Sequence, residues 1–150
     1  LSDLSDVKYK NDIVNDCYYL AYQNTTQAKT TLQALHKANK LAIVSNFYGN
    51  LSHVIDDFGL SSYFETIVDS GNEGVAKPDK EIFMVAVKQL NLSPECCTVV
   101  GDSYYKDIMP AKAIGCRTIW LNQKGWNNHT GTTSDADIII SSIAELETSD

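Results

Sequence analysis

Apolar and polar positions alternate along most of the chain in two periods. Short runs rich in β-branched and apolar residues predict buried strands, and they lie at residues 41–45, 64–68, 97–100, 117–121 and 136–140. Between them, apolar residues recur three or four positions apart, which predicts helices with one buried face, at residues 51–58, 78–90, 107–114 and 143–146. Strands that alternate with helices form βαβ units. The pattern therefore predicts an α/β fold, a Rossmann-like parallel sheet with helices on both faces.

Two further helices are expected before the first predicted strand. Ile13, Val14 and Tyr18 belong to an apolar set at helical spacing within residues 9–22. The segment Asn24-Thr-Thr26 then supplies a helix-start signal for a second helix. Because these helices lie outside the alternation, they indicate an appendage to the α/β body.

Polar residues follow the predicted strands at the points where ligands bind in open α/β sheets. Ser45 and Asn46 end the first strand, Asp102 ends the third, and Lys77 lies in a loop before a helix. In a parallel sheet the carboxyl ends of all strands share one edge, so these groups are expected to converge. Asp107 follows Asp102 by five residues and is expected to support it.

This set of groups suits phosphoryl transfer. Ser45 and Asn46 are expected to bind phosphate through the serine hydroxyl and exposed amides, and Lys77 to bind it and neutralise its charge. Asp102 with Asp107 can hold Mg²⁺, which prefers one or two carboxylates plus substrate and water. Together they predict metal-assisted electrostatic catalysis.

Each of these residues also has a purely structural interpretation. Ser45 and Asn46 can form a turn, Lys77-Pro-Asp79 can start a helix with proline in the first turn, and Asp107 can be a helix N-cap. A structural interpretation is harder for Asp102, because a carboxylate buried at a strand end needs a partner.

Composition narrows the function classes. The chain has 150 residues, enough for one domain, and its net charge of −7 disfavours a nucleic-acid or anionic-membrane surface, which would need a basic patch. Four cysteines and three histidines show no zinc-ligand spacing, which predicts reduced, mostly buried thiols. The sequence has neither a signal-peptide pattern nor an apolar run of ~18 residues, so a cytoplasmic location is expected.

Three segments, in order and spacing, resemble the haloacid dehalogenase (HAD) superfamily, in the subgroup with a helical cap inserted early in the chain. They are Leu41-Ala-Ile-Val-Ser-Asn46, Gly74-Val-Ala-Lys-Pro-Asp-Lys-Glu-Ile-Phe83 and Val99-Val-Gly-Asp-Ser-Tyr-Tyr-Lys-Asp107. The resemblance covers about residues 29–146. It implies that Ser45 binds phosphate, that Lys77 steadies the phosphate and the nucleophile, and that Asp102 and Asp107 carry Mg²⁺.

The same resemblance implies a nucleophilic aspartate in an early D-x-D-x-[T/V] motif, which this sequence lacks. Asp3 and Asp6 have the wrong spacing, and the apolar run beside Asp135-Ala-Asp137 follows the acidic pair instead of preceding it. We therefore expect a fragment of a longer enzyme, without its nucleophile and inactive alone. Residues 1–28 would be a cap remnant and its connection, and residues 29–150 the core.

In the family, the absent strand lies at the centre of the sheet, between the strands that end at Ser45 and Asp102. Without it, two ladders of backbone groups lose their partners. The sequence leaves two alternatives open: the flanking strands pair directly, or another strand fills the gap. That strand would come from a homodimer partner or from a complementing N-terminal segment.

The expected parent activity is a Mg²⁺-dependent phosphatase that acts on a small phosphorylated metabolite through an aspartyl-phosphate. A 2-haloacid dehalogenase is disfavoured because its fourth motif resembles S-N-x-x-D, whereas this chain has Gly101-Asp-Ser103. A phosphomutase shares the motifs, and a non-catalytic binding module of the same fold is the alternative from another class. Tyr104 and Tyr105 are expected to divide between core and solvent, and the loop at 123–134 to border the site or lie in solvent.

Overall fold

All five predicted strands form, and their pairing is parallel. The computed structural model describes residues 4–123 and 135–148, with side chains at residues 10–123 and 135–146. The strands are β1 (Ala42–Ser45), β2 (Thr66–Asp69), β3 (Thr98–Gly101), β4 (Arg117–Leu121) and β5 (Ile138–Ile140). Their carboxyl ends therefore share one direction within each sheet, as the predicted α/β fold requires.

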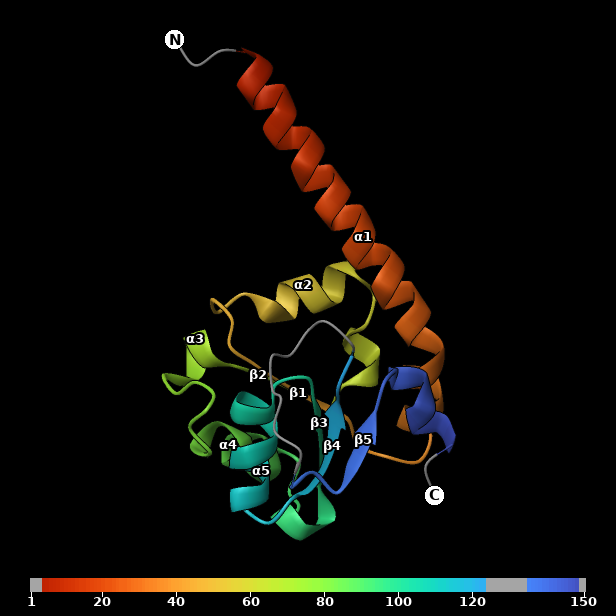
Figure 1. The fold of residues 1–150 in the computed structure, drawn as a ribbon. Helices are drawn as coiled ribbons and strands as arrows, with labels where there is room; N and C mark the ends of the chain where they lie inside the picture. Colours follow the sequence, from red (N-terminus) through yellow and green to blue (C-terminus); the bar gives the residue numbers. More distant parts are fainter. Residues whose placement is uncertain (1–3, 124–134, 149–150) are drawn as a thin grey trace.

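The strands form two sheets instead of one. β1 pairs with β2, and β3, β4 and β5 pair in that order, so β1 and β3 share no ladder in the described part of the chain. Direct closure of the gap, one of the two alternatives from the sequence, is therefore wrong for this structure. Figure 1 shows β1 and β3 between the outer strands of the two sheets.

Helix α4 (Glu81–Gln89) joins the two sheets through apolar contacts. Its inward residues belong to a buried cluster that both Val44 of β1 and Val99 of β3 contact. The cluster consists of Val68, Ile82, Phe83 and Ala86. A second cluster, in which Val87 packs with Ala111 and Cys116, lies between α4 and the β3–β4 side. The core is therefore continuous under α4 although the hydrogen-bonded ladder is interrupted.

The remaining helices are mostly short. They are α2 (Leu51–Asp57), α3 (Ser70–Glu73), a π-helical turn at Tyr104–Ile108 that continues into α5 (Met109–Ala113), and 3₁₀ turns at Ser61–Tyr63, Pro94–Cys96 and Ile143–Thr148. Residues 69–74, for which neither a strand nor a helix was predicted, contain α3, and the helix expected to begin at Asp107 begins three residues earlier. Pro78 lies outside α4, because the helix begins only at Glu81.

The two predicted N-terminal helices are one helix, α1 (Leu4–His36). The expected break at residues 24–26 is wrong because the threonines do not cap a new helix. The hydroxyls of Thr25 and Thr26 instead donate to the carbonyl of Tyr22, at 2.9 and 2.8 Å. This back-bonding satisfies the hydroxyls inside a continuous helix.

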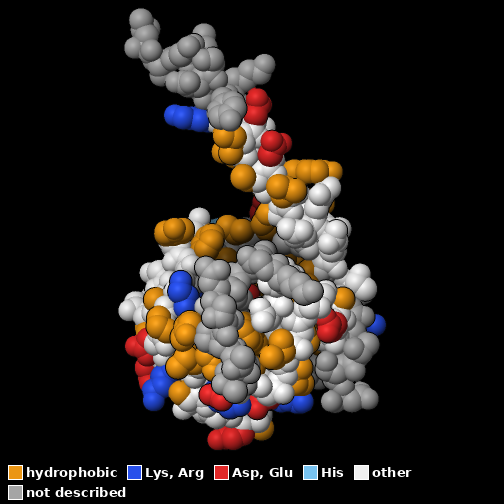
Figure 2. All heavy atoms as spheres, viewed as in Figure 1, with side chains coloured by type: hydrophobic (Ala, Val, Ile, Leu, Met, Phe, Trp, Pro, Cys, Tyr) orange, Lys and Arg blue, Asp and Glu red, His pale blue; other side chains and the backbone are white. Residues whose placement is uncertain are grey.

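α1 projects from the α/β body (Figure 1), and Figure 2 shows apolar side chains along the projecting part. Tyr18 and Tyr22 anchor the helix by packing on Phe58, with ring centroids 5.5 and 6.5 Å apart. The hydroxyl of Tyr18 also donates to Asp57 at 2.8 Å. Among the described helices, none combines the length and the apolar character needed to cross a bilayer.

Candidate functional site

Ser45 and Asn46 end β1 at the carboxyl edge of its sheet. Ser45 is half-buried and lies in register with Asp69 of β2. The side chain of Asn46 forms a reciprocal pair with the backbone of Lys77: its Nδ2 donates to the Lys77 carbonyl at 2.9 Å, and the Lys77 N–H donates to its Oδ1 at 2.7 Å. The predicted phosphate-binding amide side chain is therefore engaged in holding Lys77.

Lys77 reaches from this loop to Asp107. Its Nζ lies 2.7 Å from Asp107 Oδ1, and the two side chains are 17% and 6% exposed. A charge-assisted hydrogen bond this short and this shielded is stronger than a surface ion pair. Two of the predicted site residues, which lie 30 positions apart in the sequence, therefore meet directly.

Asp107 lies under the end of β3. Its Oδ2 accepts the Ser103 N–H at 3.0 Å. If Gly101 carried a β-carbon, that atom would lie 2.3 Å from the β-carbon of Asp107. The N-cap interpretation of Asp107 is wrong, because Ser103 occupies the cap and accepts the Lys106 N–H. Glycine at 101 is thus the residue that lets the carboxylate approach the strand end and face Lys77.

Asp102 follows β3 and is exposed, so the burial expected for its carboxylate is wrong. Its backbone carbonyl accepts the indole N–H of Trp120 at 3.0 Å. Tyr104 is buried and packs on Trp120 at 5.4 Å, whereas Tyr105 is 59% exposed. The expected division of the two tyrosines is confirmed. The buried pair of Tyr104 and Trp120 thus holds the backbone at Asp102 in place.

Oxygen ligands and negative charge are the chemistry that Mg²⁺ requires, and Asp102 and Asp107 supply both. Both oxygens of Asp107 accept hydrogen bonds, from Lys77 and Ser103, so this carboxylate already has protein partners. Across the described residues, no three histidine, cysteine or acidic side chains gather at one point. The donor set fits a cation that takes few protein ligands and keeps its waters.

Asp69 was not predicted from the sequence as a candidate site residue. It ends β2, is 2% exposed, and accepts three backbone N–H groups, from Gly49, Leu51 and Gly71, at 2.9 to 3.0 Å. Burial raises the pKa of Asp69, but these donors outweigh it and hold the pKa below its usual value. The argument applied to Asp102, that a buried carboxylate at a strand end needs partners, would have identified it.

The second acidic pair considered in the sequence has a structural role at Asp137. Its carboxylate accepts Lys112 Nζ at 2.9 Å and the N–H and hydroxyl of Thr118 at 2.8 Å each. These hydrogen bonds, first that from Lys112, lower the pKa of Asp137 to about 2. Residues 124–134, most of the loop expected to border the site, lie outside the described part of the chain.

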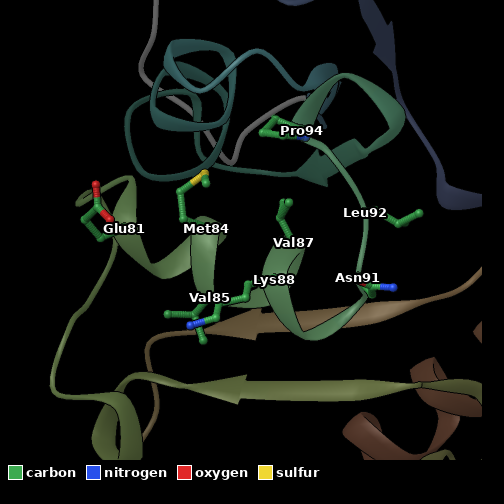
Figure 3. Close-up of a pocket in the computed structure, with 8 residues that line it drawn as sticks. All are labelled: Glu81, Met84, Val85, Val87, Lys88, Asn91, Leu92 and Pro94. Carbon is green, nitrogen blue, oxygen red and sulfur yellow. The ribbon is translucent and has the colours of Figure 1, made fainter.

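A surface hollow of about 470 Å³ lies on α4, away from these polar groups. Figure 3 shows Met84 and Val87 on the side of the helix that faces Pro94. The lining does not include Ser45, Lys77, Asp102 or Asp107, so the hollow is separate from the candidate site. The site is instead an exposed edge where two sheets end side by side.

Comparisons with known proteins agree with this arrangement. The profile of the haloacid dehalogenase-like hydrolases matches residues 7–115. A glyceraldehyde 3-phosphate phosphatase from Pyrococcus furiosus is 34% identical over an alignment of 114 residues, and the match covers 68% of this chain and 47% of that protein. The pyrimidine 5'-nucleotidase YjjG from Escherichia coli is 34% identical over 122 residues, 80% of this chain and 53% of that one.

Solved structures give the same result. The HAD-hydrolase YfnB from Bacillus subtilis, solved bound to magnesium, superposes with a TM-score of 0.72 at 27% identity, covering 81% of this chain and 53% of the other. The chain thus spans about half the length of the relatives it matches. The match over residues 7–115 is longer than half of the chain. Within it, Lys77 contacts both Asn46, which follows β1, and Asp107, which follows β3. The chain belongs to the haloacid dehalogenase-like hydrolase family.

Proposed function

We propose that this chain provides the phosphate- and metal-binding part of a Mg²⁺-dependent phosphatase acting on a small phosphorylated metabolite. The observation that carries the proposal is the connected set Asn46, Lys77 and Asp107, which links the ends of β1 and β3 by short polar contacts. A lysine held between two strand ends and paired with a carboxylate presents positive charge where a phosphate would lie.

Each residue then has a distinct role. Ser45 donates its hydroxyl to a phosphate oxygen, and Lys77 offsets the charge of the phosphate. Asn46 keeps Lys77 in place through its side chain, so its contribution to phosphate binding falls to its backbone N–H. Asp102 binds Mg²⁺, with Asp107 in support, and the ion when bound supplies Lewis-acid stabilisation of negative charge.

The nucleophile of the aspartyl-phosphate route comes from outside this set of residues. A strand that ends in the nucleophilic aspartate fills the gap between β1 and β3 and pairs with those edges of the two strands that carry no ladder within the described residues. Support comes from the separation of the two sheets together with their common contact to α4. A complementing N-terminal segment supplies this strand. A second copy of the chain that filled the gap with another strand would bring no nucleophile. The 150-residue chain alone is then inactive.

The relatives favour a phosphate ester over a haloacid or a purely binding role. Those described above act on a sugar phosphate and a nucleotide, according to their names. A phosphatase needs the acidic residue after Gly101, which is present, whereas a binding module of this fold has no chemical need for both Lys77 and Asp102. The identity of the metabolite depends on a cap.

The test is release of phosphate from a generic aryl phosphate in the presence of Mg²⁺. We expect turnover by a longer protein that contains residues 1–150 and the nucleophile strand, and loss of turnover in its Asp102→Ala variant. Asp12→Ala, on the exposed part of α1, is the matched control and retains activity. Turnover that survives Asp102→Ala, or robust turnover by residues 1–150 alone, contradicts the proposal.

A further inference from the structure

Asp69, the last residue of β2, and Ser70 and Gly71, the first residues of α3, contact the loop that follows β1; we call these three residues the β2 socket. Asp69 Oδ2 accepts the N–H groups of Gly49 and Leu51 at 2.9 and 3.0 Å. Ser70 Oγ accepts the Phe47 N–H at 3.1 Å and donates to the Phe47 carbonyl at 3.2 Å. The contacted loop residues are alternate positions along the chain, so the socket engages the loop backbone at regular steps.

Gly71 adds a steric requirement to these hydrogen bonds. A β-carbon at this position would lie 2.5 Å from the nitrogen of Gly49 and 2.7 Å from the carbonyl carbon of Tyr48. Both atoms belong to the backbone and cannot move as a side chain would. The absence of a side chain at Gly71 therefore lets the loop come close enough to reach Asp69 and Ser70.

A simple capping role accounts for only part of this geometry. As the N-cap of α3, Asp69 accepts the Gly71 N–H through Oδ1, which is the expected contact two residues away. The bonds to Gly49 and Leu51 run to residues 20 and 18 positions distant and use the other oxygen. One buried carboxylate thus joins the start of α3 to the loop after β1.

This loop contributes Asn46 to the candidate site. It begins directly after Ser45, and its first residue, Asn46, holds Lys77 through two short hydrogen bonds. Any movement of the loop backbone is transmitted to Asn46 and from there to the backbone of Lys77. Tyr48 at the loop tip is 92% exposed, so packing of its side chain does little to hold the loop.

We propose that Asp69 is a positioning residue, which acts through the loop after β1 to hold Ser45, Asn46 and Lys77 in their relative places. The inference rests on the proposed function only for the meaning of that site. The contacts on which it stands belong to the structure itself.

The experiment is nuclear magnetic resonance of residues 1–150, comparing the wild type with Asp69→Asn. The variant has the same shape and loses the charge and one acceptor oxygen. We expect amide exchange at Gly49 and Leu51 to become about tenfold faster or more, because hydrogen bonds to charged acceptors are strong. The Lys77 amide and the Asn46 side-chain amide signals should shift as well.

Asp137→Asn is the matched control, because Asp137 also accepts a backbone N–H and lies on the other sheet. It should leave the Gly49, Leu51 and Lys77 signals unchanged. If Asp69→Asn does not fold, Ser70→Ala is the second variant. It removes only the two hydrogen bonds between Ser70 Oγ and Phe47 and should shift the same signals, which would support the proposal. No shift at Lys77 or Asn46 in the folded variant would overturn it.

A change confined to Gly71 would also overturn the proposal, because Asp69 would then be only the cap of α3. The measurement needs no substrate and no turnover. The result of this experiment can therefore be interpreted even if the phosphatase assay fails. If the proposed role of Asp69 is contradicted, the phosphatase assay can still be interpreted.

Discussion

Lys77 and Asp107 carry most of the charge inside the candidate site, and each depends on the other. Replacing Lys77 by Met leaves a carboxylate that is 6% exposed without its cation. Breaking a buried pair in this way costs about 3 kcal/mol or more, and the partial exposure of Lys77 brings the expected loss to about 2–3 kcal/mol. Urea unfolding of Lys77→Met, Asp107→Asn and the double variant measures it.

The double variant is the control for this expectation. Because it leaves no unpaired charge, its loss should be clearly smaller than the sum of the two single losses. Simple additivity would mean that the two side chains do not interact in the folded protein, in conflict with the 2.7 Å contact.

Asp137 should make the free energy of unfolding depend on pH in the acidic range. Its pKa in the folded chain is about 2, below the ordinary 3.8, so the unfolded chain binds the proton more readily. Its contribution is therefore present above pH 3.8 and is lost as pH falls towards about 2. We expect Asp137→Asn to flatten the fall of unfolding free energy in this window. Asp135→Asn, two positions away, should keep the wild-type slope.

Single residues differ in how far the sequence reveals them. Ser45, Asn46, Lys77 and Asp102 were predicted to converge because strand ends share an edge. The structure joins Lys77 to Asn46 and to Asp107, which was expected only to support Asp102. Asn46 was predicted to bind phosphate, but spacing cannot tell which partner an amide side chain will take. Asp69 escaped notice because its partners lie 18 and 20 positions away, and no local pattern records them.

At the scale of elements, strands were easier to predict than helix boundaries. Runs of β-branched residues strongly favour buried strands, whereas the residues at which a helix begins and ends depend on single hydrogen bonds. Thr25 and Thr26 bond back to Tyr22, and so α1 continues through an expected break. Ser103 caps the π-helical turn, which moves the start of the next helix ahead of Asp107.

The junction of β3 with the π-helical turn depends on Gly101. In Gly101→Ala the added carbon would lie 2.3 Å from the β-carbon of Asp107, so either the strand end or Asp107 must move. We expect a loss of about 1–3 kcal/mol, typical of overpacking. Thermal or urea unfolding gives the value. Thr98→Ala, at an exposed position on the same strand, is the control; an equal loss there would show that Gly101 has no special role.

The attachment of α1 to the body should depend on Phe58. Phe58→Ala removes the ring on which Tyr18 and Tyr22 pack, and the projecting part of α1 should then be cut faster in limited proteolysis. Intact mass of the products locates the cuts. Tyr48→Ala removes an exposed ring elsewhere and should leave cleavage unchanged. Cleavage of α1 at the wild-type rate in Phe58→Ala would contradict the prediction.

At the scale of the whole molecule, the two sheets of the described residues are held together without a common ladder. On one face, the cluster that includes residues of α4 packs against Val44 and Val99. At the strand ends, Asn46 contacts Lys77 and Lys77 contacts Asp107, which links the end of β1 to the end of β3. The sequence predicted which strands flank the gap through a family resemblance. It could not predict whether they would close on each other, because closure depends on the balance between ladder bonds and the packing under α4.

This architecture makes a prediction about backbone protection. β4 pairs on both sides, with β3 and β5, whereas β1 and β3 each pair on one side only in the described structure. Amides of β1 and β3 that point into the gap should therefore exchange close to the rate of an open chain, while those of β4 exchange slowly. Hydrogen exchange resolved at single residues, on the chain at low concentration, tests this.

Raising the protein concentration then separates the two sources of a filling strand. If a second copy fills the gap, β1 and β3 gain protection together as the concentration rises, and sedimentation shows a dimer. If a separate N-terminal segment is required, protection appears only when a chain that contains that segment is added. Slow exchange in β1 and β3 in the isolated monomer would mean that the gap is already closed, and the proposal of strand complementation would fail with it.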